Sequence, residues 1–339
     1  MTQTIIFTSA NGAYLPKVRT LAKSVKRHVP NSVFVIFLAE LDATLWLSKE
    51  DNQLFDRIIT PTEVGYPDNL GWAVTHNIVE YCTAVKPQIA LQLQEEYKSN
   101  VIFFDPDTVL FSDINEILNI LNESPIIFTP HILDAEQNEN FIAIQENEIS
   151  VLKHGLYNLG FFAVAPNQIG RTFLQWYAAR LYKFCIDDPA SGLFTDQKWC
   201  DLVPVIFPQT HIYRNRGANV ASWNLSNRKL KIGDDGYIYV ENKKLIFYHF
   251  TGYDSGAGAA MTTKYSGANP IVEGLWAWYT YQLVINRNTK LQIDWSMGRL
   301  ACGYKLSNHV HKAIREVYCE DFFPGSPYAL SFSELQGML

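Results

Sequence analysis

Apolar runs alternate with segments of helical periodicity along the first part of the chain. Residues 3–8, 32–38, 56–60 and 100–105 form the apolar runs, and each run predicts a buried strand. Between the first two runs, residues 14–28 place their apolar side chains at helical spacing. Near-continuous apolar strands that are separated by helices indicate a mainly parallel sheet with both faces covered.

The remainder of the chain mixes the two patterns. Further strands are expected over 124–131, 157–165, 204–214, 228–233, 237–241 and 244–250, with Asp234-Asp235-Gly236 as a hairpin turn. Further helices are expected over 71–98 with a boundary near Pro87, over 113–121, 140–154, 168–183, 194–202 and 305–319, and from about 270. No linker rich in Pro, Gly or Ser divides the chain. We therefore predict one α/β domain over 1–265, with a mixed, mainly parallel sheet flanked by helices, and a helical extension over 266–339 that packs on it.

The composition is that of a globular protein with a sizeable core. Hydrophobic residues make up 47% of the chain, charged residues 18% and aromatic residues 14%. Most aromatic rings are expected in the core, and some in a cleft where a flat ring can stack on a sugar. The net charge of −6 and the absence of a Lys/Arg run argue against nucleic acid as a partner. A bound diphosphate would therefore need a metal or a few placed cations.

Cysteine usage and the start of the chain bear on the compartment. The five cysteines show no Cys-x-x-Cys spacing, which fits free thiols in a reducing environment. Residues 1–7 show no basic stretch followed by a long apolar one, and no apolar run approaches the ~20 residues that a spanning helix needs. A cytoplasmic protein without a transmembrane segment is therefore expected, which still allows peripheral contact with a membrane.

The sharpest local signal is a pair of aspartates that follows the apolar run 100–105. In extended backbone, residues i and i+2 point to the same side, so Asp105 and Asp107 can aim both carboxylates at one point. Ligands bind beyond the carboxyl ends of strands in open α/β sheets, and hard oxygen ligands suit Mg²⁺ or Mn²⁺. The alternative is a capped turn, with Asp107 or Asp113 as N-cap of the next helix. We favour the cap for Asp113 and metal binding for the other two.

Several segments, in a shared order, then carry a resemblance to a known family. Residues 75–87, 157–164, 194–199 and 245–252 resemble the GT-A glycosyltransferases, especially the glycogenin-like and lipopolysaccharide galactosyltransferase-like group. The resemblance extends over about residues 1–252. It implies a Rossmann-like GT-A fold and a nucleotide-sugar donor, most simply a UDP-sugar, held by Mn²⁺ or Mg²⁺. It further implies transfer with retention to a hydroxyl of a glycan, lipid-linked or protein acceptor, and it leaves inversion with a carboxylate base open.

The resemblance also implies roles for residues around the donor. Lys86 would reach the donor or the acidic pair, although a solvated surface lysine is an equal alternative. Asn158 would bond sugar hydroxyls, and Gly160 would let the substrate approach the backbone, although a glycine in a strand can also mark a bulge. Asp196 would accept hydrogen bonds from the sugar, with Gln197 near the anomeric carbon. For Asp196 the alternative is a charge at a helix N-terminus.

The last of these segments supplies a histidine and then departs from the group's pattern. His249 would be the third metal ligand, with Gly252 beside the donor, and a neutral imidazole can complete an oxygen-rich site. The group usually has a phosphate-binding lysine three residues after that glycine, where this chain has Ser255. Lys264, from a flexible Gly/Ala-rich loop, or backbone N–H groups would have to replace it.

Two further segments are candidates by their position. The turn after the first strand would hold the base and ribose through Thr8, Ala10 and Tyr14, although such turns are common. The polar and aromatic stretch 217–224 would face the acceptor, with Trp223 stacked on a sugar or simply buried.

Two rival functions remain open at this stage. Asp105 and Asp107 also match the Asp-x-Asp motif of haloacid-dehalogenase-like phosphatases, in which Asp105 would be the nucleophile and residues 233–235 the later acidic motif. Against that, three strands precede the motif, and residues 234–235 fall in an expected hairpin. A non-catalytic carbohydrate-binding protein is the other alternative, and nucleotide binding linked to Mn²⁺ separates it from a transferase.

Overall fold

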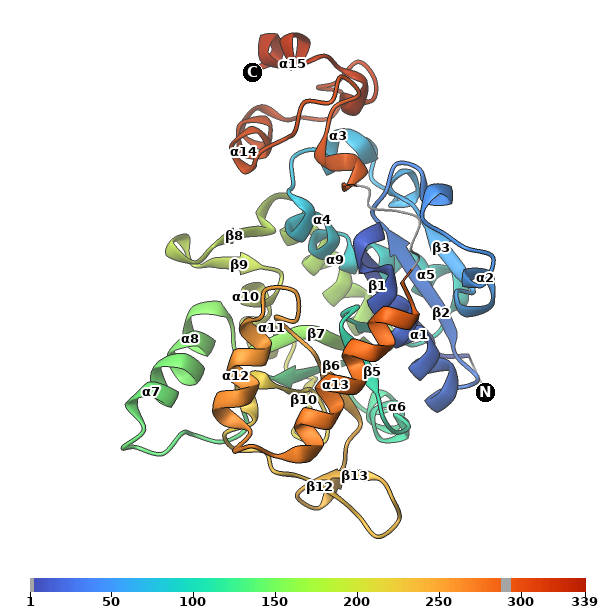
Figure 1. Cartoon of the computed structure of the whole chain (residues 1–339). Helices are drawn as coiled ribbons and strands as arrows, with labels where there is room; N and C mark the ends of the chain where they lie inside the picture. Colours follow the sequence, from blue (N-terminus) through green and yellow to red (C-terminus); the bar gives the residue numbers. More distant parts are fainter. Residues whose placement is uncertain (1–2, 288–293) are drawn as a thin grey trace.

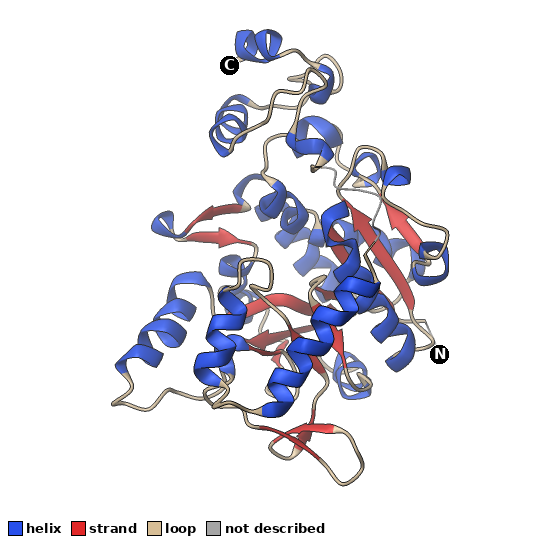
Figure 2. Ribbon diagram, in the orientation of Figure 1, coloured by secondary structure: helices blue, strands red, loops and turns tan. Residues whose placement is uncertain are grey.

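A mixed sheet of seven strands forms the centre of the molecule, in the order β10-β6-β7-β4-β1-β2-β3 (Figures 1 and 2). The computed structural model describes residues 3–287 and 294–339, so part of the expected extension over 266–339 and the first two residues of the expected domain lie outside it. The strands are β1 (Ile5–Ala10), β2 (Val33–Leu38), β3 (Arg57–Ile59), β4 (Val101–Phe104), β6 (Ile126–Pro130), β7 (Tyr157–Val164) and β10 (Thr210–Ile212). β1 to β4 run parallel, and β7 runs antiparallel to both of its neighbours. The predicted mixed, mainly parallel sheet is confirmed.

Helices cover both faces of this sheet because its strands are apolar on both sides. Along β1, Ile5 and Phe7 point into one core with α5 (Lys86–Tyr97) and α9 (Gln168–Phe184), whereas Ile6 points into the other core with α1 (Leu15–His28) and α6 (Asn115–Leu121). Each of these fully buried side chains stabilises the fold by about 1.5–3 kcal/mol. A further helix, α4 (Ile78–Ala84), directly precedes α5. Pro87 lies in the first turn of α5, at the expected boundary between two helices.

A second, smaller sheet lies beside the first and contains β5 (Thr108–Leu110), β11 (Val220–Ala221) and β15 (Phe247–His249). β15 pairs antiparallel with β5 and parallel with β11. The remaining short strands form two ribbons: β8 (Ile186–Asp188) with β9 (Leu193–Thr195), and β12 (Leu230–Ile232), β13 (Ile238–Val240) and β14 (Lys243–Lys244). The predicted hairpin turn joins β12 to β13, with Gly236 at a φ of 78°.

Two local predictions need correction. Residues expected as the start of strand 204–214 form the short helix α11 (Val203–Ile206), which precedes β10. The Gly/Ala-rich loop expected around Lys264 is the helix α12 (Ala257–Tyr265). Its Gly258 packs so closely that an added Cβ would lie 2.0 Å from the carbonyl oxygen of Thr251. Tertiary packing therefore forms a helix from residues that carry almost no helical periodicity.

The expected helix over 140–154 is present as three consecutive helical segments of different geometry. α7 (Phe141–Ala143) leads into a π-helical segment, Ile144–Ile149, and then into α8 (Ser150–His154). We call residues 141–154 the arm, which projects beside the β8–β9 ribbon in Figure 1. π-Helical segments are rare and frequent at functional sites.

The C-terminal part of the chain is helical where it is described. α13 (Pro270–Ile285) packs along α1, and α14 (Asn308–Val317) and α15 (Phe332–Met338) lie at the top of Figure 1, above α3 (Asn69–Ala73). The guanidinium of Arg315 donates to the carbonyl oxygen of Thr75 at 2.7 Å, which ties α14 to the segment between α3 and α4. α15 is an element that the sequence patterns did not predict.

Across residues 3–287 and 294–339, none of the helices combines the length and the apolar character that a membrane crossing requires.

Candidate functional site

Asp105 and Asp107 both belong to a tight turn of residues 105–108 between β4 and β5. The N–H of Thr108 donates to the carbonyl oxygen of Asp105 at 3.0 Å, which closes the turn, and Pro106 occupies a position that proline favours. The extended backbone expected through Asp105 and Asp107 is therefore wrong. Both carboxylates nevertheless line the same cavity, because the turn lies at the carboxyl end of β4.

Strand register brings a histidine and a glycine to this turn. β15 pairs with β5 so that His249 lies opposite Thr108, and the N–H of Phe250 donates to the carbonyl oxygen of Asp107 at 2.8 Å. On the other side, the N–H of Asp105 donates to the carbonyl oxygen of Gly160 in β7, also at 2.8 Å. Residues far apart in the sequence are thus fixed together by backbone hydrogen bonds.

The side chains of Asp105, Asp107 and His249 offer three ligand atoms that lie within 4.8 Å of one another. The Nε2 atom of His249 is 3.0 Å from a carboxylate oxygen of Asp107 and 3.8 Å from one of Asp105. Two hard carboxylates and one imidazole fit Mn²⁺ or Mg²⁺, which take oxygen-rich sites and keep positions for phosphate oxygens. The donor set and its spacing therefore fit the expected metal.

The charges in this cluster shift one another's protonation. Burial alone would raise the pKa of Asp107, but the charge and hydrogen bond of His249 outweigh burial and lower it to about 2. Burial raises the pKa of Asp105 in spite of Lys86 and His249. For His249, burial would lower the pKa, and the negative charge of Asp107 outweighs it and raises the value. The carboxylates thus attract positive charge to the Nε2 position, where a divalent cation would compete with the proton.

Lys86 lies in the interior beside the acidic pair, not on the surface. Its Nζ atom is 3.0 Å from a carboxylate oxygen of Asp196, 3.4 Å from one of Asp105 and 3.2 Å from the carbonyl oxygen of Leu159. The ammonium also lies over the ring of Phe103, 4.3 Å from its centroid. Burial would lower the pKa of Lys86, but the two carboxylates outweigh burial and raise it, so the side chain is charged.

Asp196 enters the cavity through an unusual backbone conformation. Thr195, at the end of β9, has a φ of 43°, which is strained for a β-branched residue and redirects the chain. Asp196 precedes the short helix α10 (Gln197–Cys200), but its side chain does not cap that helix and pairs with Lys86. Gln197 also lines the cavity, and its amide donates to the carbonyl oxygen of His154 at 3.1 Å.

Gly160 lies against the metal-ligand cluster. A Cβ at this position would lie 2.5 Å from Cε1 of His249, 2.8 Å from a carboxylate oxygen of Asp105 and 2.8 Å from Oδ1 of Asn158. Any other residue would therefore displace these side chains. The close approach at Gly160 involves the protein's own ligands, whereas the resemblance implied an approach of the substrate.

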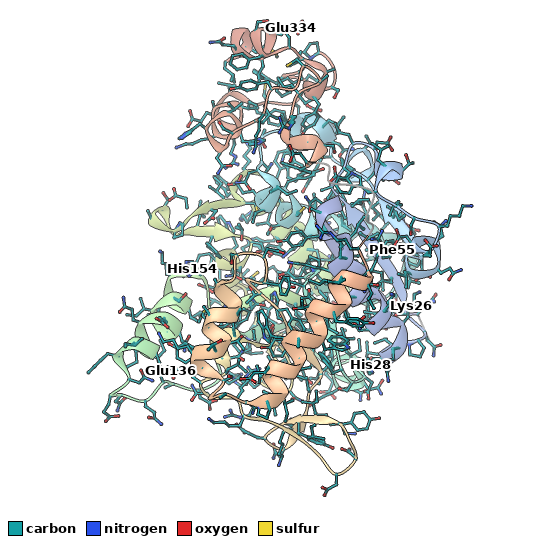
Figure 3. All side chains as sticks on the ribbon, in the orientation of Figure 1. Lys26, His28, Phe55, Glu136, His154 and Glu334 are labelled. Atoms are coloured by element: carbon teal, nitrogen blue, oxygen red, sulfur yellow. The ribbon has the colours of Figure 1, made fainter. Side chains whose placement is uncertain are left out.

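The cluster opens into a cavity of about 670 Å³. Most of the expected site residues line it: Ala10, Tyr14, Lys86, Asp105, Asp107, Asn158, Gly160, Asp196, Gln197, Trp223, His249 and Gly252. His154, another lining residue, lies at the end of the arm beside the β8–β9 ribbon (Figure 3). The centroid of its ring is 4.6 Å from that of Phe194.

Two expected residues lie elsewhere. Thr8 is fully buried within β1, below the turn that lines the cavity. The ammonium of Lys264 is exposed on α12 and pairs with both carboxylate oxygens of Glu146 in the arm, at 2.6 and 2.7 Å. Neither residue belongs to the cavity lining.

Several residues of the site were not predicted. His131 directly follows β6, so it gives the same signal as Asp105, a polar residue at the end of a buried strand. Burial lowers the pKa of its imidazole to about 4, so the ring is neutral near pH 7. Asn219 lies in the stretch 217–224 that was expected to face the acceptor, but its side chain contacts Thr129 of β6 and Asn158 of β7, and no pattern in the sequence indicates those contacts.

The acidic residues of the rival phosphatase motif are not near Asp105. Asp234 and Asp235 lie in the β12–β13 hairpin turn, where Asp235 bonds the hydroxyl of Tyr239 at 2.8 Å and pairs with Lys244 at 3.2 Å. Neither aspartate lines the cavity of Asp105.

Fold and site together define an α/β protein with a candidate divalent-cation site at the carboxyl ends of its parallel strands. No protein-family model matches the chain. The chain is 26% identical over 186 residues to YfnF, an uncharacterized protein of Bacillus subtilis (strain 168). The aligned region covers 53% of this chain and 58% of YfnF. The chain thus spans just over half the length of this relative and of a second B. subtilis protein, YfnD, at 54%.

Solved structures with some likeness to this fold include two glycosyltransferases. The galactosyltransferase LgtC, solved with donor and acceptor sugar analogs, is 15% identical with a TM-score of 0.45, covering 82% of this chain and all of that one (100%). The glycosyltransferase GlyE of Streptococcus pneumoniae TIGR4 is 14% identical with a TM-score of 0.46, covering 86% of this chain and 66% of GlyE. Likenesses at these scores assign no role to any residue of this chain.

Proposed function

We propose that this protein is a metal-dependent glycosyltransferase that moves a sugar from a nucleoside-diphosphate sugar, in the first instance a UDP-sugar, to a hydroxyl acceptor. The observation that carries the proposal is the convergence of Asp105, Asp107 and His249 at one end of a large cavity. Carboxylates and an imidazole that meet at the carboxyl end of a parallel strand suit a cation that holds a diphosphate.

The charge of the cavity supports a cation. Among the described residues of its wall, the acidic side chains are Asp105, Asp107, Glu146, Asp187 and Asp196, and Lys86 is the one lysine or arginine, beside three histidines. Such a wall repels a diphosphate unless a positive ion compensates it. Held by Asp105, Asp107 and His249, Mn²⁺ or Mg²⁺ would stabilise the charge that develops on the departing nucleoside diphosphate.

The buried pair of Lys86 and Asp196 supports a sugar-binding role on the other side of the cluster. Lys86 holds the Asp196 carboxylate in place, and a carboxylate so fixed can accept hydrogen bonds from sugar hydroxyls. Gln197 follows directly in the chain and would lie near the anomeric carbon. Retention of the anomeric configuration remains the expected outcome.

The missing lysine at position 255 leaves the phosphates to backbone groups. Lys264 is committed to Glu146, whereas Gly252 and the first turn of α12, with Ala257 and Gly258, line the cavity. The positive end of a helix favours negative charge nearby, which supports the backbone alternative. At the nucleotide end, Ala10 and Tyr14 would contact the base and ribose.

Aromatic side chains support a sugar-containing acceptor. Trp223 lines the cavity 5.4 Å from the ring of His249, and its indole N–H donates to the carbonyl oxygen of His131 at 2.9 Å. This hydrogen bond fixes the ring at the cavity wall, where it can stack on the apolar face of a pyranose.

The test is a panel of nucleotide sugars with and without Mn²⁺, scored for sugar release or transfer and for protection against heat. We expect one sugar nucleotide to raise the melting temperature only when the metal is present. A generic phosphate ester serves as the comparison substrate. Hydrolysis of that ester without response to any sugar nucleotide would favour the phosphatase alternative.

A further inference from the structure

The side-chain amide of Asn158 lies behind the metal-ligand cluster and contacts three other side chains. Its Oδ1 atom is 3.2 Å from Nδ1 of His249 and 3.2 Å from Nδ2 of Asn219. Its Nδ2 atom is 3.3 Å from Nε2 of His131. Asn158 and His131 are buried in β7 and directly after β6, so rigid strands of the central sheet hold this chain of contacts.

The contacts with Asn219 place the oxygen end of the Asn158 amide toward His249. Asn219 donates through its Nδ2 atom to the hydroxyl of Thr129 at 3.1 Å and to Oδ1 of Asn158 at 3.2 Å. With Nδ2 of Asn219 as the donor in both contacts, the Asn158 atom that faces Asn219 and His249 is the oxygen. Asn219 itself is fully buried with a φ of 52°, a conformation that asparagine tolerates and most residues do not.

The orientation of that oxygen decides the tautomer of His249. Since Oδ1 of Asn158 can only accept, Nδ1 of His249 must carry a hydrogen. The other ring nitrogen, Nε2, is the atom that lies 3.0 Å from Asp107 and 3.8 Å from Asp105. In a neutral ring with its hydrogen on Nδ1, Nε2 presents a lone pair to the space between the two carboxylates.

We propose that Asn158, oriented by Asn219 and His131, is a positioning residue that holds His249 in the tautomer and ring orientation required of a metal ligand. The proposal rests on the proposed metal dependence. Ligating histidines in general donate their second ring N–H to an acceptor that fixes them, and loss of that acceptor weakens metal binding by about 10–100-fold.

This role differs from the sugar contact that the resemblance implied for Asn158. The oxygen already accepts two hydrogen bonds and one amide hydrogen faces His131, which leaves a single N–H for any ligand. A sugar-binding asparagine would affect donor affinity and leave binding of the metal alone unchanged. A positioning asparagine affects binding of the metal alone.

The experiment measures Mn²⁺ binding to the full chain by the electron paramagnetic resonance signal of free Mn²⁺, with no nucleotide present. Asn158→Ala is expected to weaken binding by about 10–100-fold. Asn158→Asp keeps an acceptor for the His249 N–H, so its Mn²⁺ affinity is expected to fall by no more than about 3-fold from the wild-type value. Asn147→Ala is the matched control, because Asn147 is a buried asparagine of the same cavity that bonds Glu136 instead.

A second readout reports the tautomer directly. Long-range ¹H–¹⁵N spectra of histidine-labelled protein with Mg²⁺ should show His249 protonated at Nδ1, and Asn158→Ala should lose that single form. Circular dichroism and the urea midpoint establish that each variant is folded.

The outcomes separate this proposal from the proposed function. If Asn158→Ala binds Mn²⁺ like Asn147→Ala, or if Asn158→Asp binds as weakly as Asn158→Ala, the positioning role is overturned and the metal site stands. A wild type that binds no Mn²⁺ overturns both proposals. If the variants show the expected order of Mn²⁺ affinities but the wild type neither binds nor turns over any sugar nucleotide, the proposed transferase function alone is overturned.

Discussion

Lys86 and Asp196 form an ion pair of 3.0 Å in the interior, although 110 residues separate them in the sequence. Both side chains are almost completely buried, and a buried charge that loses its partner is costly. The pair connects the first turn of α5 to the strained turn after β9. The ion pair therefore contributes to the stability of the fold and also holds the Asp196 carboxylate, which lines the cavity.

Substitution of either Lys86 or Asp196 alone should therefore destabilise the fold and also lower the activity. We expect Lys86→Met to lower the free energy of unfolding by about 3–5 kcal/mol, because Asp196 would remain buried without its partner. The double variant Lys86→Met/Asp196→Leu should recover most of that free energy of unfolding, because no unpaired charge remains from this pair. Urea denaturation of the two single variants and the double variant measures the difference. Additive losses in the double variant would show that the two charges do not depend on each other.

Gly160 gives a second prediction, which concerns the shape of the metal site. Gly160→Ala should lower Mn²⁺ affinity by more than about 10-fold, because the new Cβ would displace His249 and Asp105. The control is Gly274→Ala on the exposed face of α13, where an added Cβ meets nothing within 4 Å. That control should keep the metal affinity and gain up to about 1 kcal/mol of stability. Unchanged Mn²⁺ affinity in Gly160→Ala would mean that the cluster can shift to admit a methyl group.

The candidate site is only partly visible in the sequence. Asp105, His249 and His131 are polar residues at the ends of buried strands, which is a local signal. The antiparallel direction of β7 has no such signal, because strands buried on both faces are uniformly apolar in either direction. The turn at Pro106 and the helix α12 depend on contacts with β15 and α13, and periodicity within either segment does not contain that information.

Metal addition and removal should change the stability of the folded protein. A cation that binds only the folded state raises its stability by about 2.7 kcal/mol at 100 times the dissociation constant. We expect Mn²⁺ to raise the melting temperature, EDTA to reverse that rise, and Asp107→Ala to abolish it. Asp113→Ala is the control, since the exposed carboxylate of Asp113 accepts from the N–H of Asn115 at 3.0 Å and lies outside the cluster. An Asp107→Ala protein that Mn²⁺ stabilises as well as wild type would contradict the assignment.

His76 should make the protein sensitive to acid. Burial lowers the pKa of its imidazole to about 3, with a smaller contribution from Arg315. The unfolded chain therefore binds a proton at about pH 6.5, and the folded chain does so only near pH 3. Between these values stability should fall as the pH falls, by at most about 1.4 kcal/mol per pH unit from this residue.

The measurement is the free energy of unfolding in urea at several values between pH 4 and 7.5. His76→Gln should reduce the slope of stability against pH, whatever it does to stability at pH 7.5. His309→Gln, at an exposed position of α14, should leave the slope as it is in wild type. An unchanged slope in His76→Gln would mean that other groups cause the loss of stability in acid.

Glu40 connects the C-terminal part of the chain to the expected nucleotide-binding turn. Its fully buried carboxylate accepts from the N–H of Gly12 at 2.8 Å, from the N–H of Ser296 at 3.0 Å and from the Ser296 hydroxyl at 2.5 Å. Gly12 lies between Ala10 and Tyr14, which both line the cavity. We expect Glu40→Ala to raise the KM for the sugar nucleotide by about 10-fold, with a smaller change in kcat, because the loss falls on donor binding before the chemical step.

The control for this prediction is Glu63→Ala, because Glu63 is an exposed carboxylate that caps a short helix and does not line the cavity. It should leave the KM unchanged even if it costs some stability. If Glu40→Ala lowers the urea midpoint and leaves the KM at the wild-type value, Glu40 supports the fold alone. A raised KM at temperatures where the variant is fully folded would mean that residues after 294 influence donor binding through a single buried carboxylate.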